Sequence, residues 1–200
     1  MTQAVDVLVG NHTNETSSRA EHSRQSFQVV SRALSALGLA AVWGIAAGAG
    51  MPLQALANAY KVPMVLGLSL LLSLPAVFVT RHLLQSRLSA LTLLDALVSS
   101  TFRASLLLIG FAPLLMLYAY TSRSAAPLLA QGSALTALAF GASTLVSRFR
   151  RLEAPPLEVI ALGVVSLVSL ALALWQLVAL ATPVLTMPTV FGAGIDGVLK

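Results

Sequence analysis

The chain has 200 residues, of which 57% are hydrophobic and only 10% are charged. A water-soluble domain carries about a quarter charged residues, so this composition excludes an ordinary globular domain and indicates a membrane protein. The formal net charge of +5 comes from basic residues scattered along the chain, which gives no support to nucleic-acid binding, and the lack of cysteine excludes disulfides and thiolate metal sites.

The chain begins with a polar stretch, residues 1–33, which we expect to be a cytosolic tail. It lacks the basic start and the early apolar run of a secretory signal peptide. Residues 1–25 are rich in Ser, Thr and Asn, a composition typical of a segment that stays disordered until it binds a partner. The tail is therefore interpreted either as a binding segment or as a solvated leader.

A transmembrane helical domain is predicted over residues 34–185, and its first span covers residues 34–51. At 1.5 Å per residue this run is just long enough to cross about 30 Å of hydrocarbon. It contains Gly44 and Gly48 at the small-xxx-small spacing that lets two helix backbones approach closely. The motif predicts either packing within the chain, which we favour, or a dimer interface.

The second apolar run covers residues 62–79 and follows an expected amphipathic connector at residues 52–61. Pro63 stands at its start, where a helix does not use the missing amide hydrogen, and Pro75 is expected to kink or end the helix. Lys61 precedes the run. It either meets an anionic lipid or substrate, or extends from the helix end to the membrane surface, and we favour the second interpretation.

Residues 88–120 are apolar apart from one polar stripe, whose three-to-four spacing places it on one face of a helix. The stripe consists of Thr92, Asp95, Ser99 and Arg103. In one interpretation residues 88–103 form an interfacial amphipathic helix and residues 104–120 span the membrane. In the other, one long tilted helix turns the stripe towards other helices and bends at Pro113. We favour the first, because a charge at the bilayer centre costs at least about 2.5 kcal/mol.

Asp95 and Arg103 are the first candidates for chemistry, because ionisable residues at membrane depth indicate a functional site by default. Asp95 has the chemistry for a proton or ion relay. The competing interpretations are a polar face that meets lipid headgroups, or a structural ion pair between Asp95 and Arg103 across two helical turns. We favour a structural role.

Two further spans are predicted at residues 127–147 and 159–181, followed by a short Gly-rich C-terminal tail at residues 186–200. The loop between the two spans is a candidate cytosolic basic loop, with Arg148, Arg150 and Arg151. Together the runs predict an all-α transmembrane bundle with about five spans and, before the third, an interfacial helix.

Basic residues set the expected orientation, because cytoplasmic loops of membrane proteins carry an excess of Lys and Arg. With the N-terminus inside and the C-terminus outside, nine of the 12 Lys and Arg residues fall on the inner side and three on the outer side. The inner set is Arg19, Arg24, Arg32, Arg81, Arg87, Arg103, Arg148, Arg150 and Arg151. The outer set is Lys61, Arg123 and Lys200. We therefore expect a multi-pass protein of the bacterial inner (cytoplasmic) membrane.

The sequence offers no catalytic constellation. Its three histidines lack the HExxH spacing or any comparable metal-ligand spacing, and no GxSxG elbow or Walker loop occurs. Gly192 and Gly194 lack the flanking strand and helix that a nucleotide site requires. We expect no catalytic residues, no cofactor and no metal, and hence a protein that is not an enzyme.

Several short motifs resemble small bacterial membrane proteins related to the five-span Yip family of membrane-traffic proteins. They lie within residues 40–150 and comprise Lys61-x-Pro63, Leu74-Pro75, Gln85-Ser86-Arg87-Leu88 and Phe111-Ala112-Pro113. The resemblance implies five spans and a non-enzymatic role, and it implies no site. The acidic, proline-bearing cytosolic motif of eukaryotic members is missing, so binding of small GTPases is not carried over.

The leading hypothesis is an inner-membrane protein that binds or sequesters a partner on its cytosolic side, for example a membrane-bound regulator of the anti-sigma type. The polar tail, the inward basic residues and the missing catalytic set motivate it. The alternatives are a small-solute or ion transporter or channel that uses Asp95 and Arg103, and a structural or lipid-handling subunit. The expected partners are the lipid bilayer, a cytosolic protein and, if the chain forms a homo-oligomer, a second copy.

Overall fold

The computed structural model describes residues 2–122, 125–151 and 155–184, with side chains at 23–122, 125–151 and 155–176. These residues form five helices: α1 (Thr2–Ala47), α2 (Pro52–Leu83), α3 (Ala90–Thr121), α4 (Ala125–Phe149) and α5 (Pro156–Val184). Each helix contains a segment long and apolar enough to cross a membrane. The predicted all-α bundle of five spans is confirmed. The predicted C-terminal tail, residues 186–200, lies outside the described residues.

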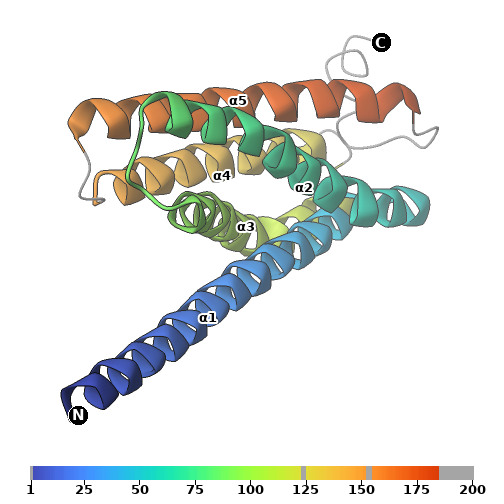
Figure 1. The fold of residues 1–200 in the computed structure, drawn as a ribbon. Coiled ribbons are helices and arrows are strands. Elements are labelled where there is room, and N and C mark those ends of the chain that lie inside the picture. Colours follow the sequence, from blue (N-terminus) through green and yellow to red (C-terminus); the bar gives the residue numbers. More distant parts are fainter. Residues whose placement is uncertain (1, 123–124, 152–154, 185–200) are drawn as a thin grey trace.

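The five helices form a ring in the order α5, α2, α1, α3, α4 (Figure 1). α1 packs along both α2 and α3, while α5 packs along α2 and α4 packs along α3. α4 and α5 share only a small contact. Among neighbouring helices of the ring, α4 and α5 therefore have the smallest contact.

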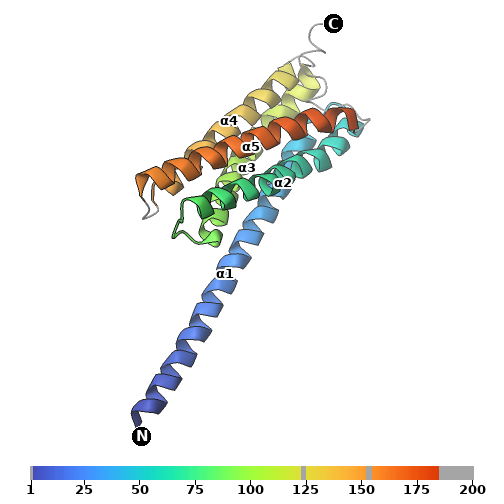
Figure 2. The same ribbon diagram turned by 45° about the horizontal axis from the view of Figure 1, so that its top comes forward.

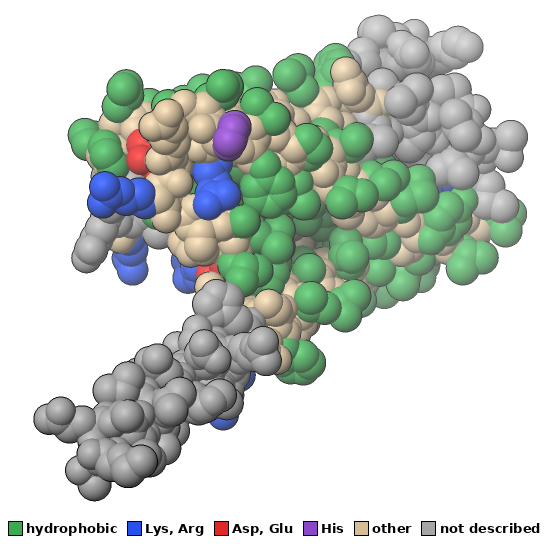
Figure 3. Space-filling model, viewed as in Figure 1, with side chains coloured by type: hydrophobic (Ala, Val, Ile, Leu, Met, Phe, Trp, Pro, Cys, Tyr) green, Lys and Arg blue, Asp and Glu red, His purple; other side chains and the backbone are tan. Residues whose placement is uncertain are grey.

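One end of the bundle is basic, and we call it the basic end. It contains the α2–α3 and α4–α5 connections, with Arg81, Arg87, Arg148, Arg150 and Arg151. Figure 3 shows Lys and Arg side chains gathered at this end, whereas hydrophobic side chains cover most of the remaining visible face. This distribution fits a body embedded in lipid with one charged end in water.

α1 is much longer than the bundle and extends past the basic end as a single helix (Figures 1 and 2). Val29, at 4% exposure, is the first described side chain that is buried. The prediction of disorder for residues 1–25 is wrong for residues 2–25, which are helical. The physical reason is that a helix already nucleated by its packed part gains one hydrogen bond for each residue added.

α2 is also longer than predicted. It begins at Pro52, so the expected connector at residues 52–61 is part of the helix, and Pro63 and Pro75 both lie inside it. The expectation that Pro75 ends the helix is wrong. Each proline removes one backbone hydrogen bond, but a membrane-embedded helix tolerates this loss because neighbouring groups satisfy the freed carbonyl.

α3 runs without a break from Ala90 to Thr121, and its N-terminal half lies inside the bundle. Residues 96–101 are all buried, which requires packing on several sides and not on one interfacial face. The favoured prediction of an interfacial helix at residues 88–103 is therefore wrong, and the alternative of one long helix is correct. Arg103 is exposed on the outside of this helix, where a long side chain can extend towards the membrane surface.

Two hydrophobic clusters hold the ring together at different levels. The first joins α2, α3, α4 and α5 towards the basic end and contains Val77, Leu93, Ala96, Leu97, Leu145, Phe149 and Leu162. The second joins α1, α3 and α4 towards the opposite end and contains Trp43, Ala46, Ala112, Leu115 and Ala130. The region between the two clusters is where a cavity lies.

Candidate functional site

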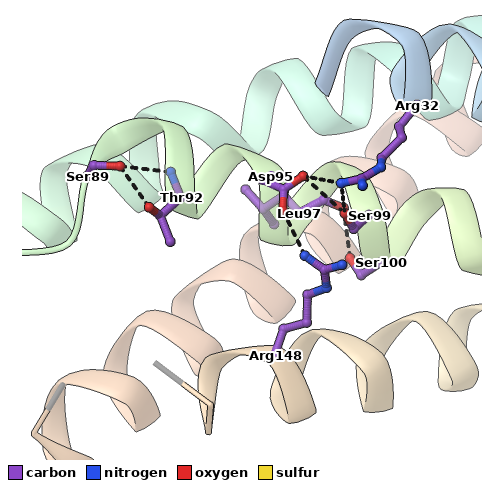
Figure 4. Close-up of polar contacts among 8 residues, drawn as sticks. All are labelled: Arg32, Ser89, Thr92, Asp95, Leu97, Ser99, Ser100 and Arg148. Carbon is purple, nitrogen blue, oxygen red and sulfur yellow. Dashed lines mark hydrogen bonds and ion pairs between the residues drawn. The ribbon is translucent and has the colours of Figure 1, made fainter. Parts of the chain in front are cut away.

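Asp95 binds two arginines that come from different helices (Figure 4). Its Oδ1 lies 2.6 Å from Nη1 of Arg32 on α1, and its Oδ2 lies 2.7 Å from Nη1 of Arg148 on α4. The Asp95 side chain is 21% exposed. The two ion pairs fasten α1, α3 and α4 together near the basic end.

Ser99 completes this network one helical turn after Asp95. Its hydroxyl donates to Oδ1 of Asp95 at 3.2 Å and accepts from Nη1 of Arg32 at 3.2 Å. Both carboxylate oxygens are therefore engaged by guanidinium groups, which make stronger hydrogen bonds than neutral donors. The arrangement suits a structural tie between helices better than an ion relay.

The remaining members of the predicted polar stripe do not join the network. Thr92 receives the cap of α3, because the Ser89 hydroxyl accepts from its backbone amide at 3.0 Å. Arg103 forms no ion pair with any described side chain, so the predicted Asp95–Arg103 pair is wrong. Within the predicted basic loop Arg148 reaches Asp95, while Arg150 and Arg151 are exposed.

The loop between α2 and α3 forms hydrogen bonds with α2 and with α5. Arg81 Nε donates to the Leu88 carbonyl at 2.6 Å, and the Ser86 hydroxyl donates to the carboxylate of Glu158 at the start of α5. These hydrogen bonds fix the loop at the basic end of the bundle, beside the first hydrophobic cluster.

Gly44 and Gly48 face the backbone of α2. A Cβ atom added to Gly44 would lie 2.5 Å from the Asn58 carbonyl oxygen, and one added to Gly48 would lie 2.5 Å from the Ala55 amide nitrogen. Only glycine permits this approach. The motif thus packs α1 against α2 within one chain, and it brings Asn58 close to α1.

Between the two hydrophobic clusters the ring encloses a cavity of about 620 Å³. Sites for small molecules in proteins measure roughly 300–1,000 Å³. All five helices contribute to its wall, which is mainly apolar; examples are Ala40, Trp43, Leu66, Leu108, Ala137 and Leu170. The cavity is therefore of a size and character to hold an apolar molecule.

Five polar residues of this wall are buried; Ser100 and Thr101 donate to the Leu97 carbonyl, and the other three are Asn58, Lys61 and Ser105. Asn58 and Lys61 from α2 are 2% and 3% exposed, and Ser105 from α3 is 1% exposed. The Asn58 amide nitrogen and the Ser105 hydroxyl make no hydrogen bond within the part of the chain that the structure describes. A buried polar atom without a partner costs about 1–3 kcal/mol, so its presence beside a cavity indicates a ligand site.

Lys61 does not lie at the end of a helix, which is the position that the sequence predicts for it. The favoured interpretation, a boundary lysine extending to the membrane surface, is wrong, because Lys61 lies inside α2 and is buried against the other helices. The error came from starting the second span at residue 62. An ionisable residue inside a membrane bundle is costly and marks a functional site by default.

The cavity is least enclosed on the side of α4 and α5, which share only a small contact. Of its lining residues, Leu138 from α4 is 44% exposed and Trp175 from α5 is 79% exposed. The small contact between α4 and α5 includes Phe149 beside Gly163 towards the basic end. These exposed lining side chains of the cavity are apolar, as expected of a surface in contact with lipid chains.

Fold and cavity together define a five-helix membrane bundle with an internal cavity of small-molecule size. Comparisons of the chain with models of protein families, with curated proteins and with solved structures give no match. The resemblance to the Yip family stays a prediction.

Proposed function

We propose that this chain is a non-enzymatic membrane protein that binds a lipid-like molecule inside its helix bundle. The observation that carries the proposal is the cavity of about 620 Å³, whose wall is mainly apolar and whose exposed lining residues include Leu138 on α4 and Trp175 on α5. A hydrocarbon chain entering from the bilayer keeps apolar surroundings throughout. This is the lipid-handling alternative that the sequence left open.

The transporter or channel alternative has less support from the geometry. It relied on Asp95 and Arg103 as groups in a conduction path. Both oxygens of Asp95 are bound by arginines, and Arg103 points away from the bundle. A carboxylate held in this way is not open to a passing ion.

We further propose that the basic end faces the cytoplasm of a bacterial inner membrane, with the N-terminus inside and the C-terminus outside. The positive-inside rule supports this orientation, since five arginines lie around the α2–α3 and α4–α5 connections: Arg81, Arg87, Arg148, Arg150 and Arg151. The part of α1 that extends past this end is then cytosolic (Figure 2). It supports a second role, the binding of a cytosolic protein.

Lipid binding is tested by mass spectrometry of the protein purified in mild detergent. The variant Ala171→Phe adds a ring at a position of α5 that lines the cavity, and its matched control Leu172→Phe places the same ring one residue later, outside the lining; both positions are exposed. We expect a defined amphiphile to co-purify with the unaltered protein and the control, and to be strongly reduced in Ala171→Phe. Equal amounts in all three proteins, or only detergent and bulk lipid in each, would overturn the proposal.

A further inference from the structure

We propose that the ligand is an amphiphile with an anionic oxygen head group, a carboxylate or a phosphate, and that Lys61, Asn58 and Ser105 bind this head. The inference rests on the proposed function, because it names the chemistry of the molecule in the same cavity. It adds a polar site to a wall that is otherwise apolar.

The hydrogen-bonding chemistry of the three side chains indicates the charge of the head group. A lysine ammonium has three donors and no acceptor, the amide nitrogen of asparagine only donates, and a serine hydroxyl can donate. The Asn58 amide nitrogen and the Ser105 hydroxyl, which have no hydrogen-bond partner among the described residues, can both donate, and Lys61 adds a cationic side chain to the same wall. An anionic carboxylate or phosphate, which only accepts hydrogen bonds, complements them, and charged acceptors make the stronger bonds.

The fold places these side chains on one cavity. Asn58 and Lys61 are three residues apart on α2, so they lie on the same helical face, and the contact of Gly44 with the Asn58 backbone fixes this part of α2 against α1. Ser105 reaches the cavity from α3. The Asn58 nitrogen and the Ser105 oxygen have almost no accessible surface of their own, so a head group reaches them when these side chains rotate about their own bonds.

The electrostatics of the wall favour an anion. Among the described residues that line the cavity there is one ionisable side chain, Lys61, and no Asp or Glu. The carboxylate of Asp95 lies near the other end of the bundle, since Lys61 stands 22 residues before the end of α2, or roughly 33 Å at 1.5 Å per residue. A positive charge inside an apolar bundle attracts a negative head group strongly, because the surrounding dielectric is low.

Tryptophan fluorescence gives a direct test, because both tryptophans of the chain line the cavity. In Trp175→Phe the remaining Trp43 is 2% exposed, so a brominated chain quenches it efficiently only from inside the bundle. The probes are dibromostearic acid, its uncharged methyl ester, and an alkyl phosphate with the same brominated chain. We expect the acid or the phosphate to bind at least about tenfold more tightly than the ester.

Lys61→Met in the Trp175→Phe background separates the head group from the chain. We expect the preference for the anionic probes to be lost while the affinity for the ester stays unchanged, and we expect the matched control Arg103→Met to keep the preference. If Lys61→Met fails to fold, the ratio of acid to ester affinity in Trp175→Phe still decides. Equal affinities there overturn the anionic head group and leave cavity binding intact, whereas no quenching by any probe overturns the proposed function as well. Stronger binding of the acid identifies a carboxylate source, and stronger binding of the phosphate identifies a phosphate source.

Discussion

Arg32 and Asp95 are separated by 63 positions in the sequence, yet Nη1 of the arginine lies 2.6 Å from Oδ1 of the aspartate. This ion pair lies near the point where α1 enters the bundle, because Arg32 follows Val29, the first buried side chain described, by three residues. Because Arg148 binds the other carboxylate oxygen, Asp95 connects three helices of the ring. The ion pairs thus add a polar link to the packing of α1 along α2 and α3.

Replacing Asp95 by Asn is expected to destabilise the bundle. The substitution keeps the shape of the side chain but leaves two arginines facing each other without a negative charge. We expect a loss of about 1–3 kcal/mol in the free energy of unfolding, which lies between the small effect of an exposed pair and that of a fully buried one. Denaturant titration of the purified protein in detergent micelles measures this loss.

The control for Asp95→Asn is Arg103→Gln. Arg103 is exposed and forms no ion pair with the described side chains, so we expect its replacement to change the free energy of unfolding by less than about 0.5 kcal/mol. Equal stabilities of Asp95→Asn and the unaltered protein would contradict a structural role for the network.

The close packing of α1 against α2 leaves no room for a side chain at position 48, so substitution of Gly48 is expected to destabilise the protein. In Gly48→Val the new Cβ atom meets the backbone of Ala55 at 2.5 Å, and backbone atoms cannot move aside cheaply. We expect a loss of about 1–3 kcal/mol or more in the free energy of unfolding, as in other overpacked sites.

Gly38 offers the matched control on the same helix. An added Cβ there meets no atom within 4 Å, and alanine is favoured over glycine inside a helix by up to about 1 kcal/mol. We expect Gly38→Ala to be neutral or stabilising in the same denaturant titration. A stable Gly48→Val would show that α1 and α2 do not approach as closely as described.

The orientation is open to test by cysteine labelling, because the chain contains no cysteine of its own. Met51→Cys places a thiol between α1 and α2, and Leu84→Cys places one at the basic end; the two native side chains are 51% and 37% exposed. In intact spheroplasts we expect a membrane-impermeant maleimide to label Met51→Cys alone. Labelling of Leu84→Cys before the membrane is broken would reverse the proposed orientation.

The part of α1 that extends past the basic end is expected to bind a cytosolic protein partner, as the proposed orientation implies. Deleting residues 1–25 leaves the bundle contacts intact, since the first buried side chain described is Val29. We expect the shortened protein to retain its melting temperature and to lose its cytosolic partners in a pull-down. If every partner remains bound, the partner-binding role has to be given up.

The number and class of the helices could be predicted from the sequence, whereas the helix lengths could not. Long runs without charge define spans directly, because lipid does not solvate charged groups. The predicted second and third spans begin directly after Lys61 and Arg103, yet both residues lie inside long helices. A single charge does not end a helix when a partner or a ligand within the bundle can compensate it.

The partners of Asp95 and the cavity could not be predicted because both depend on tertiary packing. The sequence indicates that an isolated membrane acid needs a basic partner, but the helical spacing pointed to Arg103 and not to Arg32 or Arg148. The cavity is lined by all five helices, and no local pattern records that geometry. Lys61 was the one residue whose position in the sequence could have indicated the cavity, because it stands between Asn58 and a long apolar run.

The central claim, that a lipid-like molecule occupies the bundle, is tested most directly by photo-crosslinking in native membranes. A fatty acid with a diazirine in its chain is added, activated by light and located by peptide mapping. We predict modification of residues that line the cavity, such as Val65 on α2 and Leu108 on α3, and its loss in Ala171→Phe. Modification confined to outward side chains such as Leu71 and Leu172 would contradict the claim.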